Sequence, residues 1–157
     1  MMSPNFESLV VNSLTILADE PDDATAMVWN EAETQAELEG NEKAIYRLDL
    51  NDKEILLEDI EDLIAYNKIH KVKDFRLDKN EFFDEGVELL AEASALEKLL
   101  TLSLAHNKLS DNAARSLAAS KIIVNLQKLF LQGNQIGVEG VKALVESDSL
   151  ANLQLLY

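Results

Sequence analysis

The fold is decided by a segment that occurs twice. Residues 99–109 read LLTLSLAHNKL, and residues 126–136 read LQKLFLQGNQI, a shift of 27 positions that preserves the pattern LxxLxLxxN. Stepping back by the same shift reaches two more sets of apolar residues, Val72, Phe75, Leu77 and Phe82, and then Ile45, Leu48, Leu50 and Ile55. A forward step reaches Leu153 and Leu156. We therefore expect four units of 27 residues and the start of a fifth over residues 45–157.

Each unit has two halves with different periodicity. The first half has apolar residues at alternate positions, which is typical of a short strand, whereas the second, such as DEGVELLAEASA at residues 84–95, has helical spacing. One strand and one helix cannot bury both of their apolar faces, so the units should stack with their strands parallel. We expect strands near residues 47–50, 74–78, 101–105, 128–132 and 154–156. The side chains expected to be buried between strands and helices are Leu48, Leu50, Phe75, Leu77, Leu102, Leu104, Leu129 and Leu131.

Two further columns of the repeat have a physical interpretation. Asn80, Asn107 and Asn134 end the strand half of three units. A carboxamide both donates and accepts, so these side chains are expected to satisfy backbone groups of the neighbouring turns. A small residue recurs early in the helices, where a large side chain would hold the helix away from the strand layer: Gly86, Ala113 and Gly140.

At these positions the sequence resembles the leucine-rich repeat family, in its ribonuclease-inhibitor-like subtype, over about 70% of the chain. The resemblance implies an α/β solenoid shaped as a horseshoe, with a parallel sheet on its concave face and helices on its convex face. It also implies protein recognition. The first unit departs from the pattern, because Lys53 replaces the asparagine and Asp59 the small residue, and we expect it to be a degenerate, partly capping repeat. The absence of cysteine argues against ribonuclease inhibitor itself.

Residues 1–44 do not follow the repeat, and we expect them to form an N-terminal helical cap over the open edge of the first unit. Phe6, Leu9, Val10, Leu14 and Leu17 have helical spacing, and Pro21 with Asp22 and Asp23 marks the end of that helix. A second helix is expected from about residue 23 to residue 39, before Gly40.

Trp29 is expected to anchor this segment on the first unit. The acids Glu31, Glu33, Glu37 and Glu39 permit two interpretations. They form either a docking site for a basic partner or an ordinary solvated face, and we favour the solvated face.

The chain of 157 residues has a net charge of −15 and is 47% hydrophobic, as expected of one folded domain. Residues 1–44 contain 10 acids and 1 base, residues 45–98 contain 15 and 8, and residues 99–157 contain 4 and 5. The negative electrostatic field of this acidic excess repels nucleic acid and anionic membranes and favours a basic partner.

The N-terminal apolar stretch is interrupted by polar residues and predicts no membrane span. With no cysteine, the chain fits a reducing compartment, and we expect a cytoplasmic location in its own or a host cell.

The sequence contains fragments of catalytic and metal-binding motifs, none of them complete. Asp49 and Asn51 resemble the start of a calcium loop, but Lys53 and Ile60 stand where ligands are required. The glycines after residue 132 lack the lysine of a phosphate-binding loop. His106 lies close to Ser103, but no nucleophile-elbow sequence accompanies this pair. We expect no enzymatic activity, no metal site and no cofactor.

The residues between the leucines should form three columns on the outer face of the sheet. One column contains Arg47, Asp74, Thr101, Lys128 and Leu155; the next contains Asp49, Arg76, Ser103, Phe130 and Tyr157; the third contains Asn51, Asp78, Ala105 and Gln132. Charged pairs are expected between Arg47 and Asp74 and between Asp49 and Arg76. Phe130 and Tyr157 fall side by side and are predicted to be the apolar anchors of a protein-binding surface. The predicted polar residues of that surface are Arg76, Asp78, Lys128 and Ser103.

These observations favour a non-enzymatic interaction scaffold that binds a protein through the concave face. Two alternatives remain. Some proteins with such repeats activate small GTPases, and others are sensor or regulatory fragments of larger signalling or effector proteins. Because the sequence stops within a repeat, we expect either that the natural chain continues or that two copies form a homodimer through the last strand, burying Leu153, Leu155 and Leu156.

Overall fold

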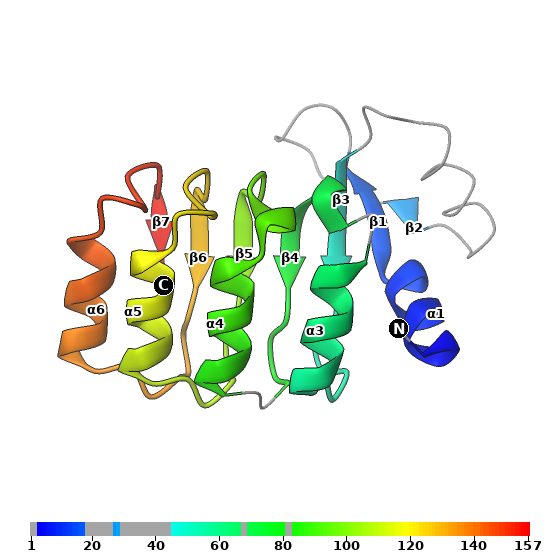
Figure 1. Ribbon diagram of the computed structural model, residues 1–157, viewed down its shortest axis with the longest axis horizontal. Helices are drawn as coiled ribbons and strands as arrows, with labels where there is room; N and C mark the ends of the chain where they lie inside the picture. The colour runs from blue at the N-terminus through cyan, green and yellow to red at the C-terminus, as the bar shows by residue number, and fades with distance from the viewer. Residues whose placement is uncertain (1–2, 18–26, 29–44, 67–68, 81–82) are drawn as a thin grey trace.

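The computed structural model describes residues 3–17, 27–28, 45–66, 69–80 and 83–157. In these residues one seven-stranded sheet runs in the order β2-β1-β3-β4-β5-β6-β7 (Figure 1). The strands are β1 (Leu14–Leu17), β2 (Met27–Val28), β3 (Ile45–Asp49), β4 (Val72–Arg76), β5 (Thr101–Ser103), β6 (Lys128–Phe130) and β7 (Leu155–Leu156). The helices are α1 (Pro4–Asn12), α3 (Leu57–Ala65), α4 (Asp84–Glu92), α5 (Asp111–Ala119) and α6 (Val138–Val145), with 3₁₀ turns η1 (Ile69–Lys71) and η2 (Ser94–Leu96).

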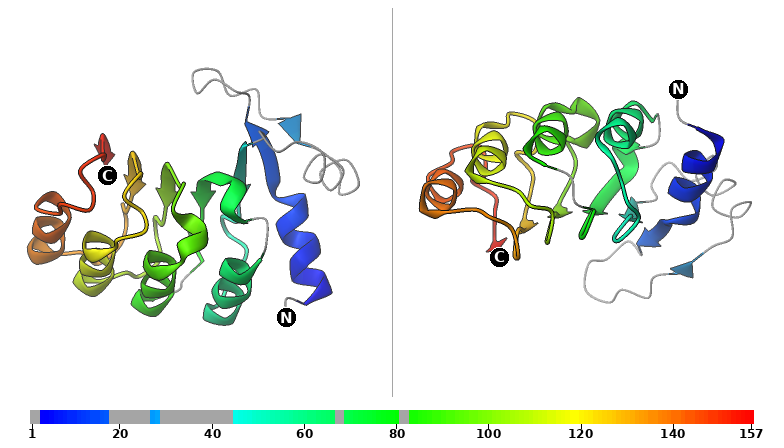
Figure 2. Two further views of the ribbon diagram at one scale, coloured as in Figure 1. Left: turned by 45° about the horizontal axis from the view of Figure 1, so that its top comes forward. Right: turned by 90° about the horizontal axis from the view of Figure 1, so that it is seen from below.

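Strands and helices form two layers. Helices α3 to α6 each follow one strand and stand in a row on the same side of the sheet (Figure 2). We call the side of strands β3 to β7 that points away from these helices the open face. The alternation of strand and helix and the parallel pairing of β3 through β7 confirm the predicted α/β repeat architecture.

The predicted 27-residue register is confirmed in the pairing of the strands. Phe75 is paired with Leu102, and Leu102 with Leu129, so equivalent positions of successive units lie side by side. All eight predicted core side chains of the strand halves are buried. Strands β3 to β6 end earlier than predicted, and β7 ends at residue 156 as predicted. The hydrogen bonds continue beyond the shortened strands, since the Leu77 N–H donates to the Ser103 carbonyl at 2.9 Å and the Lys79 N–H to the Ala105 carbonyl at 2.9 Å.

The predicted asparagine ladder is confirmed atom by atom. The Asn107 side-chain amide donates to the Leu77 carbonyl at 2.8 Å, and its Oδ1 accepts from the Asn80 N–H at 2.8 Å. Asn134 repeats this arrangement one unit later, with its amide 2.9 Å from the Leu104 carbonyl and its Oδ1 2.8 Å from the Asn107 N–H. Each asparagine therefore ties its own turn to the preceding unit.

The recurring small residue early in the helices has a different neighbour from the one predicted. A Cβ atom on Gly140 would lie 2.5 Å from Asp111 Oδ1 and 3.1 Å from the Ala114 Cβ, both on α5, and 2.7 Å from Ile136 Cγ2. The close approach is thus mainly between α6 and the preceding helix, with no strand atom among these nearest contacts.

The predicted N-terminal helical cap is wrong in part. Helix α1 ends at Asn12, and Leu14 and Leu17 belong to β1, which runs antiparallel to β3. The expected second helix is contradicted at residues 27–28, which form β2 antiparallel to β1. Two physical causes favour the strand: Thr15 and Ile16 are β-branched, and β3 otherwise presents an unpaired edge.

The sheet is therefore mixed, with antiparallel pairing at its N-terminal end and parallel pairing through the repeats. Trp29, Gly40 and the four glutamates between them lie outside the described residues. Among the residues that the structure does describe, no helix is both long and apolar enough to cross a bilayer.

Candidate functional site

The open face carries the three predicted columns. Strand pairing places Arg47 beside Asp74, Asp74 beside Thr101, and Thr101 beside Lys128, and the next column runs through Arg76, Ser103 and Phe130. The columns differ in chemistry along the sheet, since charged side chains dominate on β3 and β4, whereas β6 and its neighbour β7 carry Phe130, Tyr157 and Leu155 beside the single charge of Lys128.

An ion-pair cluster fills the β3–β4 part of the open face. Asp74 accepts from Arg47 Nε at 2.7 Å and from Arg76 Nε at 3.1 Å, and its side chain is almost covered. The lateral pair of Arg47 with Asp74 is as predicted. Arg76, which was predicted to pair with Asp49, instead donates two hydrogen bonds to Asp74 on its own strand.

The ion-pair cluster stabilises the charged form of Arg76. Partial burial by itself lowers the Arg76 pKa. The hydrogen bond and charge of Asp74, together with the charges of two further aspartates, outweigh that effect and raise the pKa above its usual value. The guanidinium therefore stays charged, and two of its five N–H donors are directed at Asp74.

A second polar ladder, which the sequence reasoning missed, runs along the third column. Asn51 Oδ1 accepts from the Asp78 N–H at 2.6 Å, and Asp78 Oδ1 accepts from the Ala105 N–H at 2.8 Å. The Ser103 hydroxyl also donates to Asp78 Oδ1 at 2.6 Å, and Ser103 is buried. The recurrence of a short acceptor side chain at positions 51 and 78 was the available signal, since these residues are 27 positions apart. Asp78 and Ser103 are thus joined to each other.

The β6–β7 part of the open face is aromatic. The rings of Phe130 and Tyr157 are stacked, with centroids 5.8 Å apart and planes inclined by 4°. Tyr157 is 66% exposed, and its backbone is held to β6 by bonds with Leu129 and Leu131 of 3.1 and 2.7 Å. Lys128, also exposed, stands on the same strand as Phe130. Phe130 is half-buried, so Tyr157 is the member of the stack that faces solvent.

The side chains that resemble parts of a calcium loop or a catalytic pair make structural contacts. Asp49 Oδ1 accepts from the Asn51 N–H at 3.1 Å, and Asn51 supports the next turn, so both side chains serve the backbone. Within the described residues, no group of three or more His, Cys, Asp or Glu side chains is arranged to hold a metal ion. The Ser103 hydroxyl donates to an aspartate, while the exposed His106 lies against Gly133.

The comparison with protein families agrees with this geometry. The family model described as Leucine Rich repeat matches residues 95–118 and 124–145, which begin at the end of the second unit, extend into the fourth and make up less than a third of the chain. No curated protein matches the sequence. Two segments of the chain therefore match leucine-rich repeats, a class of repeat that generally mediates contacts between proteins.

Proposed function

We propose that this chain is a non-enzymatic scaffold of the ribonuclease-inhibitor-like subtype, which binds a protein partner on the open face of its sheet. In this proposal the open face is the concave side of a horseshoe, residues 1–44 cap the first unit, and the partner is a cytoplasmic protein with a basic contact surface. The net charge of −15 supports a basic partner.

The stacked pair Phe130 and Tyr157 is the observation that carries the proposal. Tyr157 is exposed and stacks on the half-buried Phe130, so a partner that covers this pair removes apolar surface from water without having to order the rings first. Aromatic side chains also dominate the hot spots of protein interfaces. The equivalent positions of the preceding strands hold Arg76 and Ser103, so the fold itself does not require an aromatic side chain in this column.

The polar residues of the open face have different parts in this proposal. Lys128 and Arg76 form the rim that contacts the partner's polar groups. Asp78 offers its second carboxylate oxygen, since Oδ1 is occupied by Ser103 and the Ala105 N–H. Ser103 then acts by orienting Asp78, because its own hydroxyl is committed.

The test compares variants in their capture of the same partner. The partner is first identified by affinity capture from lysate on the wild-type chain, and its affinity is then measured for Phe130→Ala and Lys128→Ala. Loss of a central anchor should weaken binding by about 30-fold, whereas loss of the rim lysine should change it little. Thermal unfolding of each variant serves as the control for folding. Equal binding by Phe130→Ala and wild type would refute the open-face site.

The proposal also includes self-association through β7. Among the described strands β7 pairs only with β6, and Leu155 lies half-buried in the outer column. Leu153 and Leu156, which were expected at the dimer contact, instead pack partly against the core. A dimer contact would therefore involve Leu155 and the β7 backbone more than the other two leucines.

A further inference from the structure

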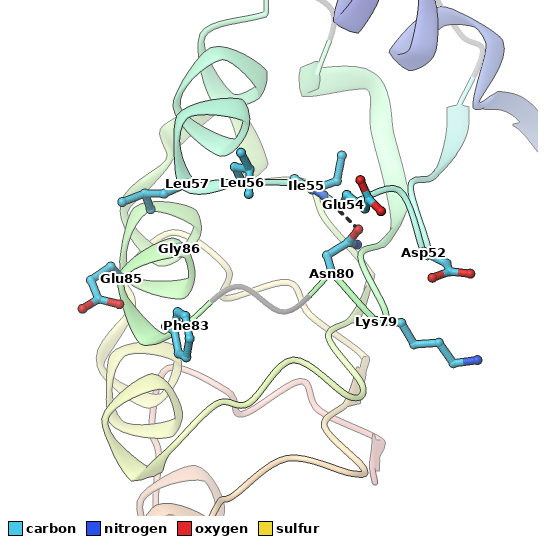
Figure 3. A pocket seen from close by; sticks show the side chains of 10 residues that line it. All are labelled: Asp52, Glu54, Ile55, Leu56, Leu57, Lys79, Asn80, Phe83, Glu85 and Gly86. Carbon is cyan, nitrogen blue, oxygen red and sulfur yellow. Dashed lines mark hydrogen bonds between the residues drawn. The ribbon is translucent and has the colours of Figure 1, made fainter.

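Large apolar side chains are exposed where the first two repeat helices begin. Leu56 is 56% exposed, Leu57 is 43% exposed and Phe83 is 59% exposed. They line a hollow of about 630 Å³ between the first turns of α3 and α4 and the turns that follow β3 and β4 (Figure 3). This hollow lies at the edge of the two layers, away from the open face of the sheet.

These side chains occupy positions at which helices ordinarily have a polar residue. Leu56 and Phe83 are the N-cap residues of α3 and α4, and neither makes a side-chain capping bond. Ser110 stands at the equivalent position of α5, where its hydroxyl accepts from the Asn112 N–H at 3.2 Å, and Gly137 caps α6. Serine and glycine are favoured at N-caps and leucine is not. At α3 the Leu56 N–H donates to Asp59 Oδ2 at 2.9 Å, so the leucine side chain itself has no part in the cap. Both units therefore expose apolar surface at the cap position, although α5 and α6 show that the fold does not require it.

The polar lining of the hollow is predominantly acidic. Asp52, Glu54 and Glu85 contribute three carboxylates against the single ammonium of Lys79, and all four side chains are exposed. In Figure 3 Leu56, Leu57 and Phe83 lie on the helix side of the hollow together with Glu85, whereas Asp52, Glu54 and Lys79 lie toward the turn side. An apolar patch with an acidic rim is complementary to an apolar side chain between basic ones.

We propose that this hollow is a docking site for a segment of another protein that presents one leucine or aromatic side chain flanked by lysine or arginine. The anchor packs on Leu56, Leu57 and Phe83, and the flanking cations meet the three carboxylates. A second copy of this chain is a poor occupant, because residues 45–98 contain 15 acids and 8 bases and repel an equally acidic surface. The site is separate from the open face, so either can fail without the other.

The probe is a fluorescently labelled synthetic peptide with a central phenylalanine between lysines and arginines. One matched peptide has glycine at the centre, and another has glutamates in place of the basic residues. The full chain is titrated with each peptide while anisotropy and backbone amide NMR shifts are recorded. We expect binding only of the first peptide, weakening with added salt, with shift changes grouped at residues 52–57, 79–80 and 83–86. Binding of the glutamate peptide with equal affinity, no binding of the first peptide, or shifts elsewhere would refute the proposal.

Variants separate docking from folding. Leu56→Ser and Phe83→Ser copy the cap residue of α5, so thermal stability should be kept or raised while peptide affinity falls at least about tenfold. Glu85→Lys should weaken binding of the peptide through charge alone.

The matched control is Val145→Ser, which removes an exposed apolar side chain from α6 at the other end of the sheet and should leave the affinity for the peptide unchanged. Phe130→Ala should also bind the peptide normally, so a failed open-face site is distinguished from a failed hollow. If the double variant Leu56→Ser/Phe83→Ser kept its affinity for the peptide, the assignment of the docking site would be wrong.

Discussion

At the scale of single residues, the asparagine of each unit is the main polar link between neighbouring turns. Asn107 is buried, and its carboxamide serves a carbonyl of the preceding unit and an N–H of the preceding turn. These backbone groups have no access to water, so their hydrogen bonds must come from protein atoms. The side chain must both donate and accept, which among short side chains favours asparagine.

Asn107→Ala should lower the free energy of unfolding by about 2 kcal/mol or more, because the Leu77 carbonyl and the Asn80 N–H lose their partner inside the protein. Urea denaturation measures this loss. The control is Asn112→Ala on the exposed face of α5, where a change within about 0.5 kcal/mol is expected. Equal stability of the two variants would contradict the role assigned to the ladder.

The residue before the asparagine position of each unit has a left-handed backbone conformation, whatever its side chain. Asp52, Lys79 and His106 have φ values of 56°, 58° and 59°, and Gly133 in the same column has 72°. Glycine adopts this left-handed conformation without steric cost, whereas other residues adopt it at some expense. The turn after each strand therefore imposes one conformation on four different side chains.

At the scale of the element, each short strand is held mainly by burial of its inward side chains. Leu102 in β5 is buried between sheet and helices, whereas Thr101 on the same strand belongs to the outer column and is half-buried. Strand β5 lies between β4 and β6, so its packing supports two interfaces of the repeat stack.

Leu102→Ala should destabilise the protein by about 2–5 kcal/mol, because it leaves a cavity in a close-packed core. Chemical denaturation followed by circular dichroism gives the value. Thr101→Ala, on the same strand, is the matched variant and should cost much less. A loss below about 1 kcal/mol for Leu102→Ala would show that the core relaxes around the cavity or that the strand packs differently.

At the scale of the whole molecule, the acidic charge is distributed unevenly along the chain. The acidic excess belongs to residues 1–98, whereas residues 99–157 have 4 acids and 5 bases. Helix α6 in that near-neutral part exposes Val138, Val141 and Val145, and it follows β6 in the chain. Two copies can therefore approach at this end with little electrostatic repulsion.

From this distribution and the proposed contact at β7, we expect concentration-dependent association of the protein. Light scattering across a range of concentrations should give a rising average mass. Leu155→Lys should shift the association to higher concentration, because it places a charge at the contact, and Phe83→Ser serves as a control far from it. A constant monomer mass for wild type at every concentration would refute association at this end.

The sequence by itself determined the repeat, its period, the parallel pairing of β3 to β7 and the eight buried strand residues. Periodic patterns report these features because every unit must bury the same face against the same neighbour. The neighbouring position of Phe130 and Tyr157 followed from the same register, since a shift of 27 places equivalent residues on adjacent strands.

Only the tertiary structure decided the features that depend on non-repeated contacts. Leu14–Leu17 have helical spacing with the residues before them but form β1, because pairing with the edge of β3 outweighs local preference. Arg76 donates its hydrogen bonds to Asp74 and not to Asp49, and Asp78 accepts from a backbone N–H. Neither bond follows from strand register alone, because side-chain rotamers and competing partners determine which groups meet. The exposure of Leu56 and Phe83 was likewise hidden, since the sequence pattern does not distinguish an apolar side chain in the core from one at a helix cap that faces water.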